Sequence, residues 1–204
     1  MTGRATNDSP TSSPQREQGA PSPSNSSRPC SPSPLQPLLW ALLKPAFRLS
    51  PQPLHNIRRK ILTLCGAKVA GNAKIRPSAK IDRPWNLSLG ELAIIGDDAE
   101  INAAEPISIG ARCVVSQLAV LTTDIVEPDQ TGTPDPFQRR RGPIAIEDDS
   151  WVATETMVLP GATVRTGTVV GARGLIEGEL PEWSVCVGQP ARRIKDRGFV
   201  NATA

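Results

Sequence analysis

The chain has 204 residues, a formal net charge of +3 and only 3% aromatic residues, with no tyrosine. This length suffices for one domain, and a core of aliphatic and small side chains argues against a sandwich or bundle with buried aromatics. One histidine, His55, and four cysteines without a C-x-x-C pair exclude a histidine metal site, a zinc site and a disulfide framework, so free thiols in a reducing cytoplasm are expected.

Residues 1–36 are rich in Ser and Pro and nearly free of large apolar residues, so a disordered tail is expected. No apolar stretch typical of a secretory signal stands at the N-terminus. In residues 37–66 the pattern predicts two short helices, Leu38–Leu43 and Leu54–Leu64, separated by a break at two prolines.

The second predicted helix is amphipathic. Leu54, Ile57, Ile61 and Leu64 share one face, while Arg58–Lys60 occupy the rest. Such a helix either caps the end of a core or lies on a membrane surface, and both readings stay open. The first apolar run is far too short to span a bilayer.

Charge is unevenly distributed along the chain. From Leu38 to Lys80 there are nine Lys and Arg and no acid, whereas Asp82 to Glu182 contains 17 acids and seven bases. A basic N-terminal module suggests an anionic neighbour such as a membrane surface or phosphates, although solvated helix faces explain it equally well. The acidic middle segment argues against a nucleic-acid partner.

Within residues 67–180 an aliphatic residue recurs every six positions, and a small residue stands two positions before most of them. The longest unbroken run is Ile146, Val152, Val158, Val164, Val170 and Ile176. A period of six is typical of a parallel β-helix of hexapeptide repeats, in which three hexads make one triangular coil. We therefore expect an all-β solenoid of about five stacked coils around an aliphatic core. Glycines such as Gly90, which follow an aliphatic residue, are expected to ease the turns.

Residues 122–143 interrupt this period with acids, prolines and threonines. The pattern predicts an irregular inserted loop, and such inserts in a regular frame often carry function. After residue 180 a basic segment, 181–204, completes the chain.

Several stretches between residues 38 and 197 resemble one family in order and spacing. They are "SPQPLHNIRRKILTLCGAKV", "RPWNLSLG", "ISIGARCVVSQLAVL", "PIAIEDDSWVATETMVLPGATV", "VVGARGLI" and "VGQPARRIKDR". Together they resemble the colanic-acid biosynthesis acetyltransferases of the hexapeptide-repeat family. The resemblance implies a left-handed β-helix, a homotrimer with each active site between two neighbouring β-helices, and O-acetyl transfer from acetyl-CoA to a sugar, without a metal. A lipid-linked acceptor would place the protein at the inner face of the membrane.

The resemblance also implies a general base, which in relatives is a histidine just after an S-Q-x-x-x-L-x-T stretch. Here that stretch is Ser116–Thr123, and Val126 stands at the histidine position. A base matters because a sugar hydroxyl is a poor nucleophile, and general-base catalysis contributes about 10²–10⁴-fold.

Three readings of this substitution stay open. In the first, a carboxylate of Asp124, Glu127 or Asp129 replaces the histidine, with its pKa raised by burial between subunits. In the second, His55 reaches in from a neighbouring chain. In the third, the protein binds CoA or a sugar, or acts as a scaffold, without catalysing transfer.

For the acetyl-CoA site, the resemblance implies five residues. Trp151 points outward and corresponds to a tryptophan near the CoA-binding cleft of relatives, while Gly171 and Ala172 correspond to backbone that meets the pantetheine arm. Arg192 and Arg193 are placed to meet the 3′-phosphate and diphosphate, as arginine suits phosphate geometry. Packing between subunits, turn formation and a solvated basic tail are the respective alternatives.

Two asparagines are candidates for the acceptor side. Asn86 stands in the "PWN" stretch. Asn102 stands where relatives often carry tyrosine, which implies a different acceptor pocket.

Overall fold

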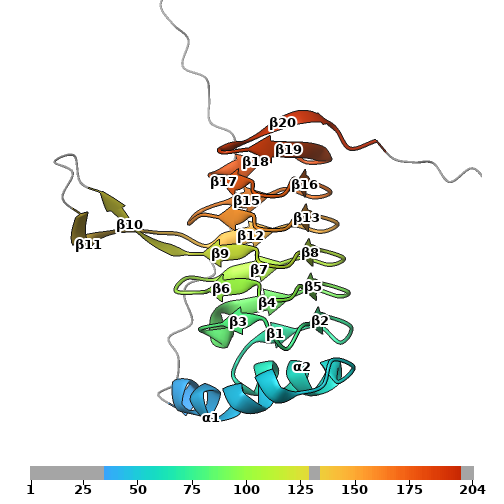
Figure 1. The fold of residues 1–204 in the computed structure, drawn as a ribbon, viewed down its shortest axis with the longest axis vertical. Coiled ribbons are helices and arrows are strands. Elements are labelled where there is room, and N and C mark those ends of the chain that lie inside the picture. The colour runs from blue at the N-terminus through green and yellow to red at the C-terminus, as the bar shows by residue number, and fades with distance from the viewer. Residues whose placement is uncertain (1–34, 129–133, 199–204) are drawn as a thin grey trace, which may run out of the picture.

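The computed structural model describes residues 35–128 and 134–198. The predicted tail, except for Leu35 and Gln36, and the candidate base Asp129 lie outside the described residues. Helices lie at the base of Figure 1, and the strands stack above them along the long axis of the molecule.

Three parallel sheets form the sides of a triangular solenoid. Sheet A contains β1 (Lys68–Val69), β4 (Leu87–Leu89), β7 (Ile107–Ile109), β12 (Ile144–Ile146), β15 (Thr163–Val164) and β18 (Glu179–Leu180). Sheet B contains β2 (Lys74–Ile75), β5 (Ile94–Ile95), β8 (Val114–Val115), β13 (Trp151–Val152), β16 (Val169–Val170), β19 (Ser184–Gly188) and the antiparallel β20 (Ala191–Asp196). Sheet C contains β3 (Lys80–Ile81), β6 (Glu100–Asn102), β9 (Val120–Thr122), β14 (Met157–Val158) and β17 (Leu175–Ile176). The fold is the expected left-handed parallel β-helix of about five turns.

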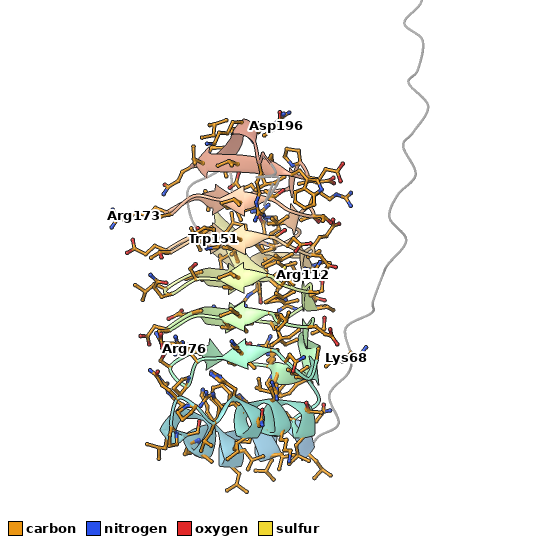
Figure 2. The ribbon with its side chains drawn as sticks, turned by 90° about the vertical axis from the view of Figure 1, so that its right-hand side faces the viewer. Lys68, Arg76, Arg112, Trp151, Arg173 and Asp196 are labelled. Atoms are coloured by element: carbon orange, nitrogen blue, oxygen red, sulfur yellow. The ribbon has the colours of Figure 1, made fainter. Side chains whose placement is uncertain are left out.

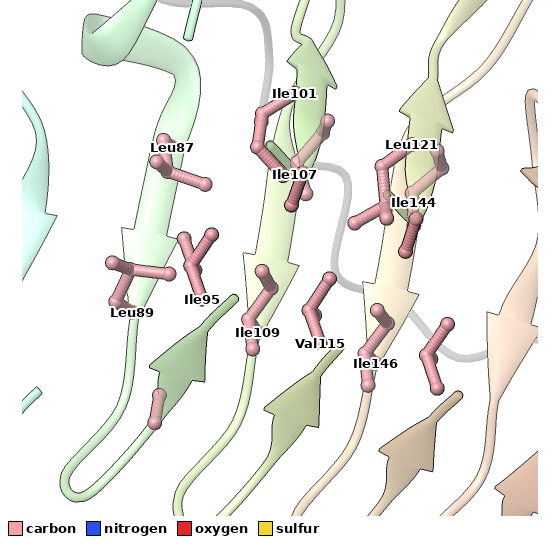
Figure 3. Close-up of a cluster of buried hydrophobic side chains, with 14 of the residues drawn as sticks. Leu87, Leu89, Ile95, Ile101, Ile107, Ile109, Val115, Leu121, Ile144 and Ile146 are labelled. Atoms are coloured by element: carbon pink, nitrogen blue, oxygen red, sulfur yellow. The ribbon is translucent and has the colours of Figure 1, made fainter. Parts of the chain in front are cut away.

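The aliphatic residues of the six-residue period fill the interior. Ile75, Ile95, Val115, Val152 and Val170 are fully buried along sheet B, and Figure 3 shows buried aliphatic side chains of successive coils side by side. Small residues such as Ala93 and Ala99 are buried as well. The core therefore matches the sequence pattern, which explains why this chain needs so few aromatics.

The glycines that follow the aliphatic residues serve a different purpose from the expected one. Gly90 is not among the residues with positive φ, whereas Leu92, two positions later, has a φ of 58°. A Cβ on Gly90 would lie 2.5 Å from the backbone nitrogen of Ala111 in the next coil. The glycine is therefore required because neighbouring coils approach closely, and the turn places its left-handed residue elsewhere.

Two helices form an N-terminal cap, α1 (Leu35–Leu49) and α2 (His55–Leu64), which closes one end of the solenoid (Figure 1). The predicted end of the first helix at Leu43 is wrong, because α1 continues through Pro45. Trp40 and Phe47 are 5% and 1% exposed, and burial of these rings outweighs the cost of the internal proline. No helix in the described ranges is long and apolar enough to cross a membrane.

The predicted faces of α2 also need correction. Arg58 was expected on the polar face, but its side chain is fully buried together with Ile61 and Leu62. Ile57 and Leu64, expected on the apolar face, are 45% and 63% exposed. The helix is rotated because Arg58 donates hydrogen bonds to the carbonyl oxygens of Ile75 in the first coil and of Pro51 and Gln52 in the connection between α1 and α2.

The insert is an antiparallel hairpin, not the irregular loop that was predicted. It consists of β10 (Asp124–Pro128) and β11 (Pro134–Arg141), and it projects sideways from the stack in Figure 1. Pro128 and Pro134 face each other at the far end of the ladder, where prolines cost few strand hydrogen bonds. The hairpin leaves the solenoid between β9 of sheet C and β12 of sheet A, so it marks the C–A corner.

At the other end, the solenoid extends past the predicted limit of residue 180. β19 pairs in parallel with β16, and β20 then folds back antiparallel onto β19. The basic C-terminal segment therefore closes sheet B instead of forming a separate tail.

Candidate functional site

Two threonines fix the root of the hairpin at the C–A corner. Thr123 donates from Oγ1 to the carbonyl oxygen of Asn102 at 2.9 Å and accepts from the backbone N–H of Glu105 at 2.9 Å. Thr122 donates to the carbonyl oxygen of Asp124 at 3.0 Å. These bonds tie the first residue of β10 to the preceding coil, so the position of Asp124 is well defined.

Asp124 forms ion pairs across the hairpin. One of its carboxylate oxygens lies 3.0 Å from Arg139 and 3.2 Å from Arg141, and its side chain is 15% exposed. Desolvation acts to raise the pKa of Asp124, but hydrogen bonds and charges from both arginines outweigh it, and the net pKa is lowered. Within one chain the pKa of Asp124 is thus lowered, and the rise expected from burial between subunits stays a prediction for the assembled protein.

The other candidate bases are Glu127, Asp129 and His55. Glu127 lies in β10, but its side chain is outside the described part of the chain, as is all of Asp129. His55 lies in α2 with its Nδ1 2.9 Å from Arg58 Nη2 of its own chain. The same Nδ1 lies 3.2 Å from the carbonyl oxygen of Ile75, so this nitrogen has a partner within its own chain in either tautomer. The reading in which His55 serves a neighbouring chain therefore gains no support.

Both candidate acceptor asparagines lie near the C–A corner. Asn86, in the turn Pro84–Asn86 between β3 and β4, is buried, and its Nδ2 donates to the carbonyl oxygens of Ala103 at 2.9 Å and Ala104 at 3.2 Å. Its Oδ1 is buried without a partner among the described residues. Asn102 ends β6, is exposed, and stands beside Thr122 in the register of sheet C. Asn102 is thus the more accessible of the two.

Trp151 lies on the outer face of sheet B, as Figure 2 shows. Its side chain is 48% exposed, and its Nε1 donates to Ser116 Oγ at 2.9 Å. Ser116 was not singled out in the sequence as a partner of this tryptophan. The bond holds the indole against the preceding coil and leaves half of its surface open.

Gly171 and Ala172 form the turn from sheet B to sheet C. The N–H of Gly171 donates to the carbonyl oxygen of Cys186 at 2.8 Å, so it is already used within the chain. A Cβ at Gly171 would lie 2.8 Å from Val187 Cγ1. Packing of the next coil therefore explains the glycine, while Ala172 is exposed at the tip of the turn.

Arg192 and Arg193 lie in β20 at the C-terminal end of sheet B, and both are exposed. Arg193 forms an ion pair with Asp196. Arg192 has no ion-pair partner among residues 35–128 and 134–198. Arg192 is therefore the better placed of the two to meet an added phosphate.

The candidate residues fall into two groups on one chain. Asn86, Asn102 and Asp124 lie at the C–A corner, whereas Trp151, Gly171, Ala172 and the two arginines lie on sheet B or at its corner with sheet C. Sheet C separates the groups, so one chain does not bring them together.

Outward residues of sheets B and C are apolar in register in the later coils, whereas the first strands carry Lys74 on sheet B and Lys80 and Glu100 on sheet C. The apolar residues are Ile94, Val114, Trp151, Val169 and Val185 on sheet B, and Val120, Met157 and Leu175 on sheet C. The corresponding residues of sheet A include Lys68, Ser88, Ser108 and Thr163. Two sides of the prism are therefore suited to contact another apolar surface, and the third is polar.

Cysteines and acidic residues give no sign of a metal centre in the described ranges. No group of three His, Cys, Asp or Glu there could hold an ion. Cys65, Cys113 and Cys186 are buried and free, and burial raises the pKa of Cys113 to about 11. The Cys113 thiol is therefore protonated at neutral pH.

No family model matches the chain. A protein of Escherichia coli strain K12 that carries the name of a colanic acid biosynthesis acetyltransferase (WcaF) is 41% identical over 160 residues, which cover 78% of this chain and 86% of that protein. The chain belongs to this hexapeptide-repeat acetyltransferase family. A hexapeptide-repeat acetyltransferase of Vibrio cholerae solved with acetyl-CoA has a TM-score of 0.71 at 18% identity, covering 81% of this chain and 88% of that one. A galactoside acetyltransferase solved with coenzyme A has a TM-score of 0.70 at 19% identity, covering 81% and 82% of the two chains. Both structures share the fold of this family member.

Proposed function

We propose that the chain transfers an acetyl group from acetyl-CoA to a hydroxyl of a sugar in the synthesis of an exopolysaccharide related to colanic acid. The observation that carries this proposal is the 41% identity to the Escherichia coli protein over most of both chains. The solved relatives with acetyl-CoA and coenzyme A support the donor. The acceptor is a free or lipid-linked carbohydrate.

The proposed active unit is a homotrimer with each site shared by two chains. Two observations support it: the candidate residues form two groups separated by sheet C, and the outer faces of sheets B and C are apolar beyond their first strands. In this arrangement, the donor group of one chain faces the acceptor group of its neighbour. The donor group consists of Trp151, Gly171, Ala172, Arg192 and Arg193, and the acceptor group consists of Asn86, Asn102 and Asp124. Light scattering of the full chain tests the assembly, and a monomer that retains full transfer activity would contradict it.

In the donor half, Trp151 provides an apolar wall for acetyl-CoA, the Gly171–Ala172 turn provides backbone, and Arg192 and Arg193 meet the phosphates. Calorimetric titration with CoA and with 3′-dephospho-CoA tests the arginines. In the Arg192→Gln/Arg193→Gln variant, we expect weaker binding of CoA and a smaller difference between the two ligands. Arg48→Gln is the matched control, because Arg48 is exposed on the N-terminal cap, outside both groups of candidate residues.

In the acceptor half, Asn102 and Asn86 bind the sugar, and Asp124 or Glu127 acts as the base. The sugar oxygen attacks the thioester carbonyl carbon, the C–O bond of the ester forms, and the C–S bond breaks. The hydroxyl proton passes to the carboxylate and then to the departing CoA thiolate. Asp124 is ionised at neutral pH because its pKa is lowered, so it is in the accepting form but is a weak base.

A second proposal is a homologue that binds CoA or a sugar without catalysing transfer. It is supported by the lowered pKa of Asp124 and by the position of the sole histidine, His55, in the N-terminal cap. Titration with acetyl-CoA, followed by an acetyl-transfer assay over a panel of sugar acceptors, separates the two proposals. Binding with transfer supports the enzyme, binding without transfer supports the second proposal, and no acetyl-CoA binding by folded protein overturns the donor site.

A further inference from the structure

Helix α1 has two apolar faces. Its inner face carries Trp40 and Phe47, with Leu39 and Leu43 packed against the core. The opposite face, here named the leucine face, consists of Leu35, Leu38, Leu42 and Leu49, which are 70%, 70%, 76% and 83% exposed. These four residues follow a spacing of three, four and seven, so they lie along one line of the helix.

A helix that is apolar on both sides normally has both sides covered. At 15 residues, α1 is too short to span a bilayer. The preceding residues 1–34 contain no Leu, Ile, Val, Phe, Trp or Tyr. That segment therefore lacks the large apolar side chains that would cover the leucine face.

The N-terminal cap that carries the leucine face is positively charged. Lys44 and Arg48 lie on α1, and Lys60 lies on α2, all exposed. Among the residues that the structure describes, none of these three has an acidic partner, whereas Arg76 and Lys80 pair with acids of the second coil. A leucine stripe on a cap with unpaired cations fits an anionic lipid surface, in which acyl chains meet the leucines and phosphates meet the cations.

We propose that the N-terminal cap docks on an anionic membrane surface through the leucine face of α1. The cap closes one end of the solenoid, away from the hairpin and from most of sheets B and C, so docking leaves those surfaces free (Figure 1). The docking helix is α1 and not the amphipathic α2, whose Arg58 is buried. This inference does not depend on the proposed function, because it involves neither acetyl-CoA nor a sugar.

Vesicle co-sedimentation of the full chain, without CoA or sugar, tests the proposal. The probes are vesicles of phosphatidylcholine alone and vesicles with roughly 30% phosphatidylglycerol. We expect binding to the anionic vesicles that weakens with salt. The Leu38→Gln/Leu42→Gln variant should lose roughly tenfold in partitioning for each leucine. The matched control is Leu92→Gln/Ile194→Gln, which removes two aliphatic side chains that are 50% and 60% exposed outside the cap. This control should bind as the wild type does.

Three outcomes would overturn the proposal. One is wild-type protein that does not sediment with anionic vesicles. Another is equal sedimentation of the leucine variant and the wild type, with the fold of both checked by circular dichroism. The third is a lower mass of the leucine variant in light scattering, which would make the leucine face a contact between copies of the chain.

Discussion

In the coils of the solenoid, stability comes from many equivalent aliphatic contacts, whereas the N-terminal cap is organised around one buried cation. Arg58 is fully buried and donates to the carbonyl oxygens of Ile75 at 2.7 Å, Pro51 at 2.8 Å and Gln52 at 2.6 Å, and to Ser50 Oγ at 2.9 Å. A coil can lose one contact and retain the others. In the cap, the Arg58 side chain alone donates hydrogen bonds to several buried acceptors, so its removal leaves all of them unpaired.

The largest expected effect is therefore that of Arg58→Met. The change keeps an apolar stem but leaves several buried acceptors unpaired, and we expect a loss of about 3–5 kcal/mol in the free energy of unfolding. Urea denaturation followed by circular dichroism measures it. Lys60→Met, at an exposed position of the same helix, is the control and should change stability by less than about 0.5 kcal/mol.

A somewhat smaller effect is expected for Ile101→Ala in the solenoid. Ile101 is fully buried between coils, and its truncation leaves a cavity that costs about 2–4 kcal/mol. Denaturation of Ile101→Ala and of the exposed-site control Ile194→Ala gives the difference. If Ile101→Ala costs clearly more than Arg58→Met, the contrast between the coils and the cap is wrong.

The solenoid itself was predictable because the same six-residue pattern of aliphatic residues recurs in every coil. The six-residue spacing of residues such as Ile146, Val152 and Val158 led to the coils and their inward side chains. The expected helix at α2 also coincides with His55–Leu64 to within one residue. Repetition makes such predictions robust, since one unusual residue does not change the period.

The irregular parts could not be predicted in the same way, because they depend on single tertiary contacts. The burial of Arg58 follows from carbonyl groups of another segment, which no local pattern shows. The hairpin left one signal that was missed: Arg139 and Arg141 are two residues apart, so they share one side of a strand and meet Asp124. The pairing of Trp151 with Ser116 required counting coils across the insert.

The third effect in size concerns pH and the cap. Burial, together with the charges of Arg58, Arg76 and Lys74, lowers the pKa of His55 below its ordinary value of 6.5. As the pH falls below 6.5, the unfolded chain binds a proton that the folded chain does not, so stability is present above this pH and is lost toward the lowered folded pKa. We expect the urea midpoint of the wild type to fall on going from neutral to mildly acidic pH.

The matched control for this prediction is His55→Asn, in which the side-chain oxygen accepts from Arg58 in place of Nδ1 but does not titrate. Its midpoint should depend less on pH over the same range. Parallel pH profiles of the two proteins would show that His55 is not the titrating group.

The smallest expected effect on stability is that of Asp124→Asn in the hairpin. The partner arginines Arg139 and Arg141 are about half exposed, with side-chain exposures of 48% and 53%, and ion pairs with exposed partners contribute about 0–1 kcal/mol. The unfolding midpoint should therefore hardly change. If Asp124 is the base, acetyl transfer should fall by about 10²-fold or more while binding of acetyl-CoA stays the same. Glu91→Gln, an exposed carboxylate in a turn between sheets A and B, is the control. A large loss of stability with unchanged transfer would mean that Asp124 only holds the hairpin, and that Glu127 is the carboxylate to test next.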